Sequence, residues 1–196
     1  MDLISSPPGK ILEAIRRGDL GEKRALIESL AAHPSDRSVD ILAEILEGES
    51  WFLRDLAGKA LARLGDAAVP RLRRLLASGL WYTRAAAARS LGRMGHEESL
   101  PHLVALLSDP NLTVQSAALA SIADLVRGGA ARNTARLFWN EGARRGEELG
   151  RILLDVHPDA GRAVMEQLSD PASFLKAAPV AEEEPASVPE DERKNA

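Results

Sequence analysis

The chain has 196 residues, a length typical of a single domain or a single array of repeats. Hydrophobic residues make up 45% of it and aromatic residues only 4%, and alanine and leucine predominate, which favours close-packed helices over a β-sandwich. Because the sequence contains no cysteine, it excludes disulfide bonds, thiol nucleophiles and metal sites built on thiolates, and its net charge of −4 excludes a strongly basic protein.

The chain opens without a recognisable targeting signal. Residues 1–7 lack the basic and apolar regions of a signal peptide, and no apolar run in the sequence approaches the roughly 20 residues that a membrane-spanning helix needs. We therefore expect an N-terminal extension over residues 1–7, a cytoplasmic location and no membrane partner.

An internal repeat of 30 to 31 residues follows this extension. The segment Trp51-Phe52-Leu53-Arg54 matches Trp81-Tyr82-Thr83-Arg84, and Pro70 and Pro101 stand at matching places further on. Self-similarity at a fixed period of this length is typical of arrays of supersecondary units. We count a leading half copy and about five full copies, so residues 8–174 are predicted to form one repeat domain.

Each copy is predicted to contain two helices. In the second copy, the apolar stripe of the first helix has the spacing i, i+3, i+4, i+7 and comprises Ala57, Ala60, Leu61 and Leu64. The stripe of the second helix comprises Leu72, Leu75 and Leu76. Gly65 and Gly95 follow two first helices, where a left-handed C-cap suits glycine, and Ser38 and Ser99 are predicted to be N-caps of second helices.

A helix pair of this size cannot bury both of its stripes alone. Stacked pairs cover one another's apolar faces, which stabilises the array by about 1.5–3 kcal/mol for each fully buried aliphatic side chain. Alanine recurs at Ala57, Ala87 and Ala118, where a small side chain lets helix axes approach closely. The predicted fold is an all-α, right-handed α-solenoid of stacked antiparallel helix pairs, with first helices outside and second helices inside.

The third copy carries a family pattern over its whole length. The pattern is an aliphatic-arginine start, an Ala-Ala pair, a Leu-Gly pair and then Pro-x-Leu-x-x-Leu-Leu-x-Asp. The residues that carry it are Trp81 to Gly95, Leu100-Pro101, Leu103, Leu106-Leu107 and Asp109. Over about residues 8–171 the chain resembles HEAT repeats, and in particular the short HEAT-like repeats of phycobilisome lyases. The resemblance implies a scaffold that binds partner proteins. It also permits bilin-lyase-like activity, which we keep as a second alternative.

Charge is distributed unevenly along the copies. Residues 1–50 hold six basic and ten acidic residues, and residues 95–125 hold four acidic residues and no lysine or arginine. Between them, residues 51–94 hold nine basic residues and only two acidic ones. We call this segment the basic belt; its basic residues are Arg54, Lys59, Arg63, Arg71, Arg73, Arg74, Arg84, Arg89 and Arg93.

Helical spacing sorts the basic belt into faces. The ridge set, predicted to lie on the outer layer as a partner-binding surface or as a solvated helix face, comprises Lys59, Arg63, Arg89 and Arg93. The groove set, predicted to face the inner groove, comprises Arg71, Arg73 and Arg74. We weigh partner binding by the groove set equally with a structural role, because the third copy has no arginines at these places.

Two tryptophans and two arginines recur at matching positions of the second and third copies. Each tryptophan precedes its arginine by three residues on the same helical face, in the pairs Trp51 and Arg54, and Trp81 and Arg84. Recurrence indicates packing between copies, with a cation–π contact to arginine as part of it, and the alternative is an aromatic binding hot spot. We treat these four residues as structural repeat positions.

No motif in the sequence points to catalysis. The four histidines, none of which has a second histidine at helical i+3 or i+4 spacing, are His33, His96, His102 and His157. The sequence contains no glycine-rich phosphate loop, nucleophile elbow or Ser-His-Asp grouping. We therefore predict that the protein is not an enzyme and has no catalytic residue, cofactor or metal site.

The C-terminal residues 175–196 are predicted to be a disordered acidic tail. Residues 177–196 contain three prolines, six acidic residues and two basic ones, and they offer almost nothing bulky to bury. About twenty flexible residues span roughly 25 Å on average. The tail is therefore a possible intramolecular competitor for the basic belt.

These features predict a non-catalytic protein–protein interaction scaffold or adaptor. An acidic segment of a partner protein fits the basic groove, because charges that alternate along the array supply both attraction and register. The first alternative is a HEAT-like protein that binds nucleic acid through the same belt, which the flanking acidic regions disfavour. The sequence makes no prediction of the oligomeric state.

Overall fold

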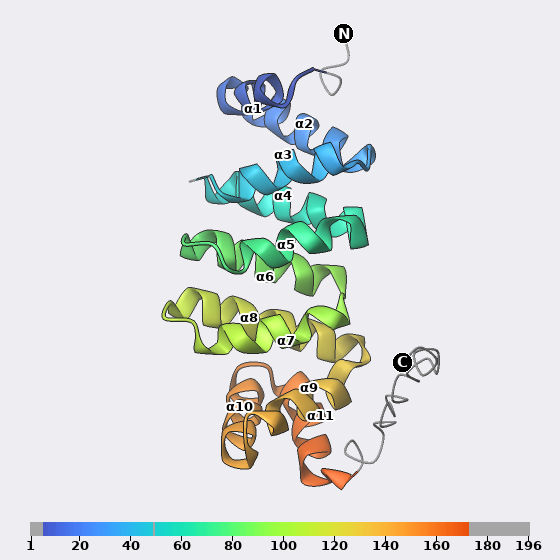
Figure 1. The fold of residues 1–196 in the computed structure, drawn as a ribbon, viewed down its shortest axis with the longest axis vertical. Helices are drawn as coiled ribbons and strands as arrows, with labels where there is room; N and C mark the ends of the chain where they lie inside the picture. Colours follow the sequence, from blue (N-terminus) through green and yellow to red (C-terminus); the bar gives the residue numbers. More distant parts are fainter. Residues whose placement is uncertain (1–5, 49, 173–196) are drawn as a thin grey trace, which may run out of the picture.

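The structure is a computed structural model that describes residues 6–48 and 50–172, and every regular element in these residues is helical (Figure 1). The first helices of the copies are α2 (Leu20–Ala32), α4 (Trp51–Leu64), α6 (Trp81–Met94), α8 (Leu112–Leu125) and α10 (Ala143–Val156). The second helices are α1 (Pro8–Arg17), α3 (Asp36–Leu46), α5 (Val69–Leu75), α7 (Leu100–Ala105), α9 (Ala131–Asn140) and α11 (Pro158–Ser169). Short helical turns are η2 (Gly65–Ala68), η3 (Glu97–Ser99), η4 (Leu106–Ser108) and the π-helical η5 (Val126–Ala130).

The helices form two layers that stack in chain order. In one layer α2 contacts α4, α4 contacts α6 and α6 contacts α8; in the other, α1 contacts α3, α3 contacts α5 and α7 contacts α9 (Figure 1). Leu61, Leu91 and Ile122 occupy the same place in three first helices, and all are 0% exposed. Each copy thus covers its neighbour's apolar face, and the predicted all-α solenoid of stacked helix pairs is confirmed.

Caps fix where several helices begin and end. Gly95 ends α6 as the predicted left-handed C-cap, with φ 73° and ψ 22°. Gly65 ends α4 with a positive φ of 63°, but its ψ of −142° lies outside the left-handed helical region. The predicted N-cap Ser38 is wrong, because Ser35 precedes α3 and its hydroxyl accepts a hydrogen bond from the Ser38 backbone N–H at 3.1 Å. Ser38 is buried within the first turn, where only the serine outside the helix can serve as a cap. Ser99 precedes α7 but makes no side-chain cap hydrogen bond.

Small residues set the close approach of the first helices. The recurring alanines are all 0% exposed: Ala57, Ala87 and Ala118. A Cβ atom on Gly92 of α6 would lie only 2.6 Å from the Cβ atom of Ser121 of α8. A Cβ atom on Gly58 of α4 would lie 2.9 Å from the Ser90 hydroxyl oxygen of α6. These contacts leave no room for a larger side chain between α4, α6 and α8.

The last copy departs from the regular stack. Between α8 and α9, the chain passes through η5, where Gly129 has a φ of 110°. The helices α9, α10 and α11 all contact one another and form a cluster at the end of the stack (Figure 1). A Cβ atom on Gly146 of α10 would lie 2.5 Å from the Phe138 carbonyl oxygen of α9, and one on Gly161 of α11 would lie 2.1 Å from the Leu154 Cα atom. The last copy is therefore packed differently from the copies before it.

The described residues reach only part of the predicted domain boundaries. The first helix, α1, begins at Pro8, directly after the predicted extension, and α11 ends at Ser169. The predicted acidic tail, residues 175–196, lies outside the described residues and stays a prediction. None of the described helices is both long enough and apolar enough to cross a membrane.

Candidate interaction surface

The basic belt lies on both layers of the stack. The ridge set comes from α4 and α6 in the layer of first helices, whereas the groove set comes from α5 in the layer of second helices. The outward faces of the two layers point to opposite sides of the molecule. The structure therefore does not combine the ridge set and the groove set into one site.

A single carboxylate joins two members of the ridge set. Asp55 of α4 receives Lys59 Nζ at 2.7 Å on Oδ2 and Arg93 Nη2 of α6 at 2.8 Å on Oδ1. Partial burial of Asp55 would raise its pKa, but the hydrogen bonds from Lys59 and Arg93 outweigh that effect and lower the pKa below its usual value. This shared pairing connects the second copy to the third and neutralises one of the two cations.

Arg63 and Arg89 are the two members of the ridge set that form no ion pair with the described residues. Arg63 is exposed and Arg89 is half-buried, and neither forms a hydrogen bond or an ion pair with another of the residues that the structure describes. Burial lowers the pKa of the Arg89 guanidinium, and the positive charge of Arg93 lowers it further. A cation that is partly removed from water beside another cation gains more from a bound anion than a fully exposed one does.

Two of the three groove residues already contact residues of neighbouring copies. Arg71 lies 3.7 Å from Asp40 and 3.6 Å from Glu47, both in or next to α3. Arg73 points the other way along the stack and donates from Nη2 to the Glu98 carbonyl oxygen at 3.0 Å. Arg74 is exposed, and the described residues offer it no such partner. In the groove set, Arg74 alone presents an unpaired guanidinium to solvent.

A cavity of about 520 Å³ lies beyond the groove set, between the start of α7 and α9. Its lining residues are Glu97, Glu98, Leu100, Pro101, Asn133, Arg136 and Leu137. The Asn133 side chain donates a hydrogen bond to Glu97, so both charge signs and an amide meet at the rim. Burial, followed by the charge of Arg73, lowers the pKa of the nearby His102. Within the described part of the chain, no three histidine, aspartate or glutamate side chains are grouped so that they could hold a metal ion.

The recurring arginines share one contact. Arg54 Nη1 donates to the Gly48 carbonyl oxygen at 2.6 Å, and Arg84 Nη1 donates to the Ser78 carbonyl oxygen at 2.8 Å, in each case six residues earlier. Arg84 also forms a bidentate pair with Asp109, with Nε–Oδ2 at 2.7 Å and Nη2–Oδ1 at 2.9 Å. The Arg84 and Asp109 side chains are 13% and 5% exposed. Their hydrogen bonds raise the pKa of Arg84 and lower that of Asp109.

The recurring tryptophans do not pack between copies as expected. Trp51 is 73% exposed and Trp81 is 44% exposed, and each ring meets the next residue edge-on, at centroid distances of 6.2 Å to Phe52 and 5.7 Å to Tyr82. The expected cation–π contact does occur, but its aromatic partner is Tyr82, whose ring centroid lies 4.4 Å from the Arg54 guanidinium carbon. The tryptophan rings are left available at the surface.

Two family models of known repeats match the part of the chain that forms this surface. A family model described as HEAT repeats matches residues 70–135, and one described as PBS lyase HEAT-like repeat matches residues 53–78. The chain therefore contains HEAT-type repeats over residues 53–135. Its basic belt lies within the matched copies, and the predicted resemblance is confirmed. No curated protein matches the sequence.

Several solved structures are similar to this chain. One is the complex of CpcE and CpcF of phycocyanin lyase from Nostoc sp. PCC7120, with 23% identity over 85% of this chain and a TM-score of 0.45. The match covers 66% of the phycocyanin lyase chain, so this chain spans just under two thirds of its length. Another is a designed armadillo repeat protein in complex with the peptide (KR)4, with 18% identity, a TM-score of 0.38, and coverage of 84% of this chain and 100% of the designed one.

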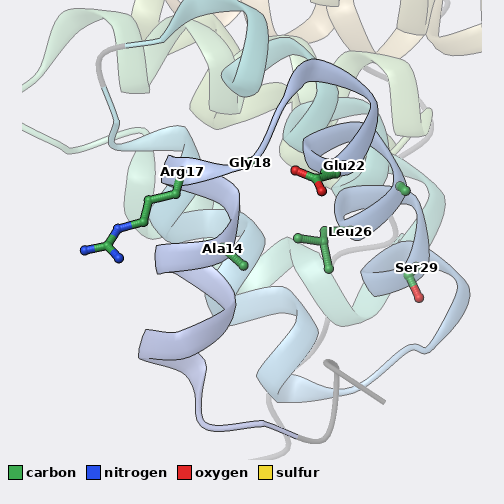
Figure 2. Close-up of a pocket in the computed structure, with 7 residues that line it drawn as sticks. Ala14, Arg17, Gly18, Glu22, Leu26 and Ser29 are labelled. Atoms are coloured by element: carbon green, nitrogen blue, oxygen red, sulfur yellow. The ribbon is translucent and has the colours of Figure 1, made fainter. Parts of the chain in front are cut away.

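The first two described helices enclose a cavity. A cavity of about 590 Å³ lies between α1 and α2, and its lining residues are Ala14, Arg17, Gly18, Glu22, Ala25, Leu26 and Ser29 (Figure 2). Leu26 and Ala14 lie inside it, whereas the Arg17 side chain points away (Figure 2). Leu26 occupies the place of Leu56 and Ala86 in the next two first helices. Leu26 is only partly buried, so the cavity exposes part of an apolar side of α2.

Proposed function

We propose that this HEAT-repeat protein is a non-catalytic, cytoplasmic scaffold that binds an acidic segment of a partner protein on the ridge set of its basic belt. The observation that supports the proposal best is Arg89, a half-buried arginine without an ion-pair partner among the described residues and with Arg93 beside it. Asp55 offsets part of the Arg89 charge from a distance, and a carboxylate bound to Arg89 would supply the direct ion pair that the described residues do not. Arg63 extends the same face with a second free guanidinium.

Charge along the array would hold such a segment in register. The segments on either side of the basic belt, residues 1–50 and 95–125, each carry an excess of four negative charges. These flanks repel an acidic ligand that slides away from the belt, so attraction and repulsion together select one position. Each exposed ion pair contributes only about 0–1 kcal/mol, and several are needed for measurable affinity.

The groove set supports binding less well than the ridge set. Arg71 and Arg73 already contact α3 and η3, so a ligand would have to displace or share these contacts. Nucleic acid binding through the belt stays the first alternative, and it would show steep loss of affinity as salt concentration rises. A bilin-lyase-like activity rests on the repeat resemblance alone.

The test is fluorescence anisotropy with a labelled glutamate-rich peptide at near-physiological salt. The double variant Arg63→Gln/Arg89→Gln is expected to bind at least tenfold more weakly than wild type. The matched control Arg24→Gln/Arg162→Gln removes two exposed arginines outside the belt and is expected to bind like wild type. Circular dichroism establishes that both variants keep their helices.

Three results would contradict the proposal. One is equal affinity of wild type and the ridge variant for the acidic peptide. Another is loss of binding in Arg74→Gln while the ridge variant binds normally, because this would move the site to the groove. The last is displacement of the peptide by a DNA duplex at the same salt concentration, which would favour the nucleic-acid alternative.

A further inference from the structure

The first residue of four successive first helices is a large, exposed apolar side chain. These residues, which we call the apolar row, are Leu20, Trp51, Trp81 and Leu112, with exposed fractions of 62%, 73%, 44% and 74%. They account for four of the seven large hydrophobic side chains that the described residues expose. A feature that recurs once per copy at the same helix position is a property of the array rather than of one loop.

The packing of the helices places the row along one edge of the stack. The helices α2, α4, α6 and α8 run in the same direction and contact one another in order, so their N-terminal ends lie side by side. Figure 1 shows the turns that lead into α4, α6 and α8 along the left edge of the ribbon. Because neighbouring helix axes are about 8–10 Å apart, the row repeats at that interval over roughly 25–30 Å.

The four side chains of the row together expose a large apolar area. It amounts to roughly 500 Å², within the range of the largest apolar patch on an ordinary monomer, and such patches are often functional. The edge-on contacts of Trp51 with Phe52 and of Trp81 with Tyr82 hold the two central rings against their own helices. Restrained, exposed aromatic rings are typical of binding hot spots.

A cavity of about 400 Å³ adjoins the row near Trp51. It lies between α1, α3 and the start of α4, and Ser50 and Leu53, the neighbours of Trp51, help to line it. The other apolar lining residues include Leu12, Ile15 and Ile45, and charged side chains of Arg16, Lys23 and Glu44 stand around them. The row thus offers a concave apolar pocket beside an exposed aromatic ring, and a large apolar side chain of a ligand can fill such a pocket.

We propose that the apolar row binds an amphipathic α-helix of a partner protein that presents one large apolar side chain at every seventh residue. Residues seven apart in an α-helix are separated by about 10.5 Å and lie on nearly the same face, which matches the interval between copies. A helix of about 20 residues covers the whole row. The row is too small for a stable contact between two globular copies, which needs about 800 Å² from each partner. This surface is separate from the ridge set and does not depend on it.

The test uses a helical peptide with leucine at every seventh position, labelled for fluorescence anisotropy. Wild type is expected to bind it, with a blue shift of tryptophan emission as Trp51 and Trp81 leave water. The variant Trp51→Ser/Trp81→Ser is expected to bind at least tenfold more weakly. The control variant Ile152→Ser/Val156→Ser removes two other exposed apolar side chains, on α10, and is expected to bind like wild type.

The outcome separates three occupants of the row. Equal binding of a peptide with leucine at every fifth position would overturn the proposal, because the interval would not matter. Tighter binding of a proline-rich peptide in the extended polyproline conformation would also overturn it. Concentration-dependent self-association of wild type that disappears in Trp51→Ser/Trp81→Ser would assign the row to a second copy instead.

Discussion

Arg84 and Arg89 lie five residues apart on α6, yet their surroundings differ completely. Arg84 forms a buried bidentate pair with Asp109, whereas Arg89 has no such partner among the described residues. The repeat register predicted that Arg84 recurs as a structural position. It could not predict that Arg84 pairs with Asp109. Asp109 lies in the turn that follows the third copy, and the second copy has no acidic residue at the matching place. Pairing across copies depends on side-chain reach, which spacing within one helix does not encode.

Removal of Arg84 is expected to be costly. The variant Arg84→Ala leaves the buried Asp109 carboxylate without its ion-pair partner, although the Asn111 backbone N–H still donates to Oδ1 at 2.8 Å, and a loss of about 3 kcal/mol is expected. The comparison variant Arg54→Ala removes the shared carbonyl contact without stranding a carboxylate, and a loss of about 1 kcal/mol is expected. Urea unfolding followed by circular dichroism measures both losses. Equal losses in the two variants would show that the pair with Asp109 contributes nothing.

The same pair makes a pH-dependent contribution. Since the folded protein holds the pKa of Asp109 below its unfolded value, the pair stabilises the fold above about pH 4 and loses this contribution as acid protonates the folded carboxyl. Below about pH 4, the stability difference between wild type and Arg84→Ala is therefore expected to shrink. A constant difference down to pH 2 would contradict this assignment.

At the scale of elements, the apolar stripes and capping glycines predicted the helices of the central copies well. The stripes determine which face of each helix is buried, and this information is local in the sequence. The cap of α3 was misplaced by one turn because Ser35 and Ser38 stand within three residues of each other. The clustering of α9, α10 and α11 was not predicted, since it depends on contacts such as that of Gly146 with Phe138, which connect different helices.

The contact between α6 and α8 should tolerate no added methyl group. In Gly92→Ala the new Cβ would lie 2.6 Å from Ser121, so we expect a loss of about 1–3 kcal/mol despite the better helix propensity of alanine. The control Gly9→Ala, in α1, meets no atom within 4 Å and is expected to be neutral or slightly stabilising. Thermal unfolding compares the two variants. If the Gly92→Ala and Gly9→Ala variants were equally stable, α6 and α8 would be shown to move apart without cost.

For the whole molecule, the sequence predicted the stack and the basic belt because both follow from a fixed period and from charge counts. Helical spacing assigned the ridge set and the groove set to different layers, and the helices that carry them lie in different layers. The sequence did not predict the partners of Arg71 and Arg73. Both side chains connect the second copy to its neighbours, and such contacts between copies leave no trace in the pattern of a single copy.

The acidic tail is expected to compete with an acidic ligand. Deletion of residues 177–196 should raise the affinity for the glutamate-rich peptide at least twofold, because a tethered competitor at near-millimolar effective concentration is removed. A full-length variant in which the six acidic residues of this segment become amides should behave like the deletion. Unchanged affinity in both would mean that the tail does not contact the binding surface.

Mapping of the acidic peptide on isotope-labelled protein by NMR tests the proposed function most directly. The account predicts chemical-shift changes concentrated on the exposed positions of α4 and α6 around Arg63 and Arg89, including the arginine Nε–H signals. Changes confined to α5 and α7, or to α10 and α11, or no changes at saturating peptide, would contradict it.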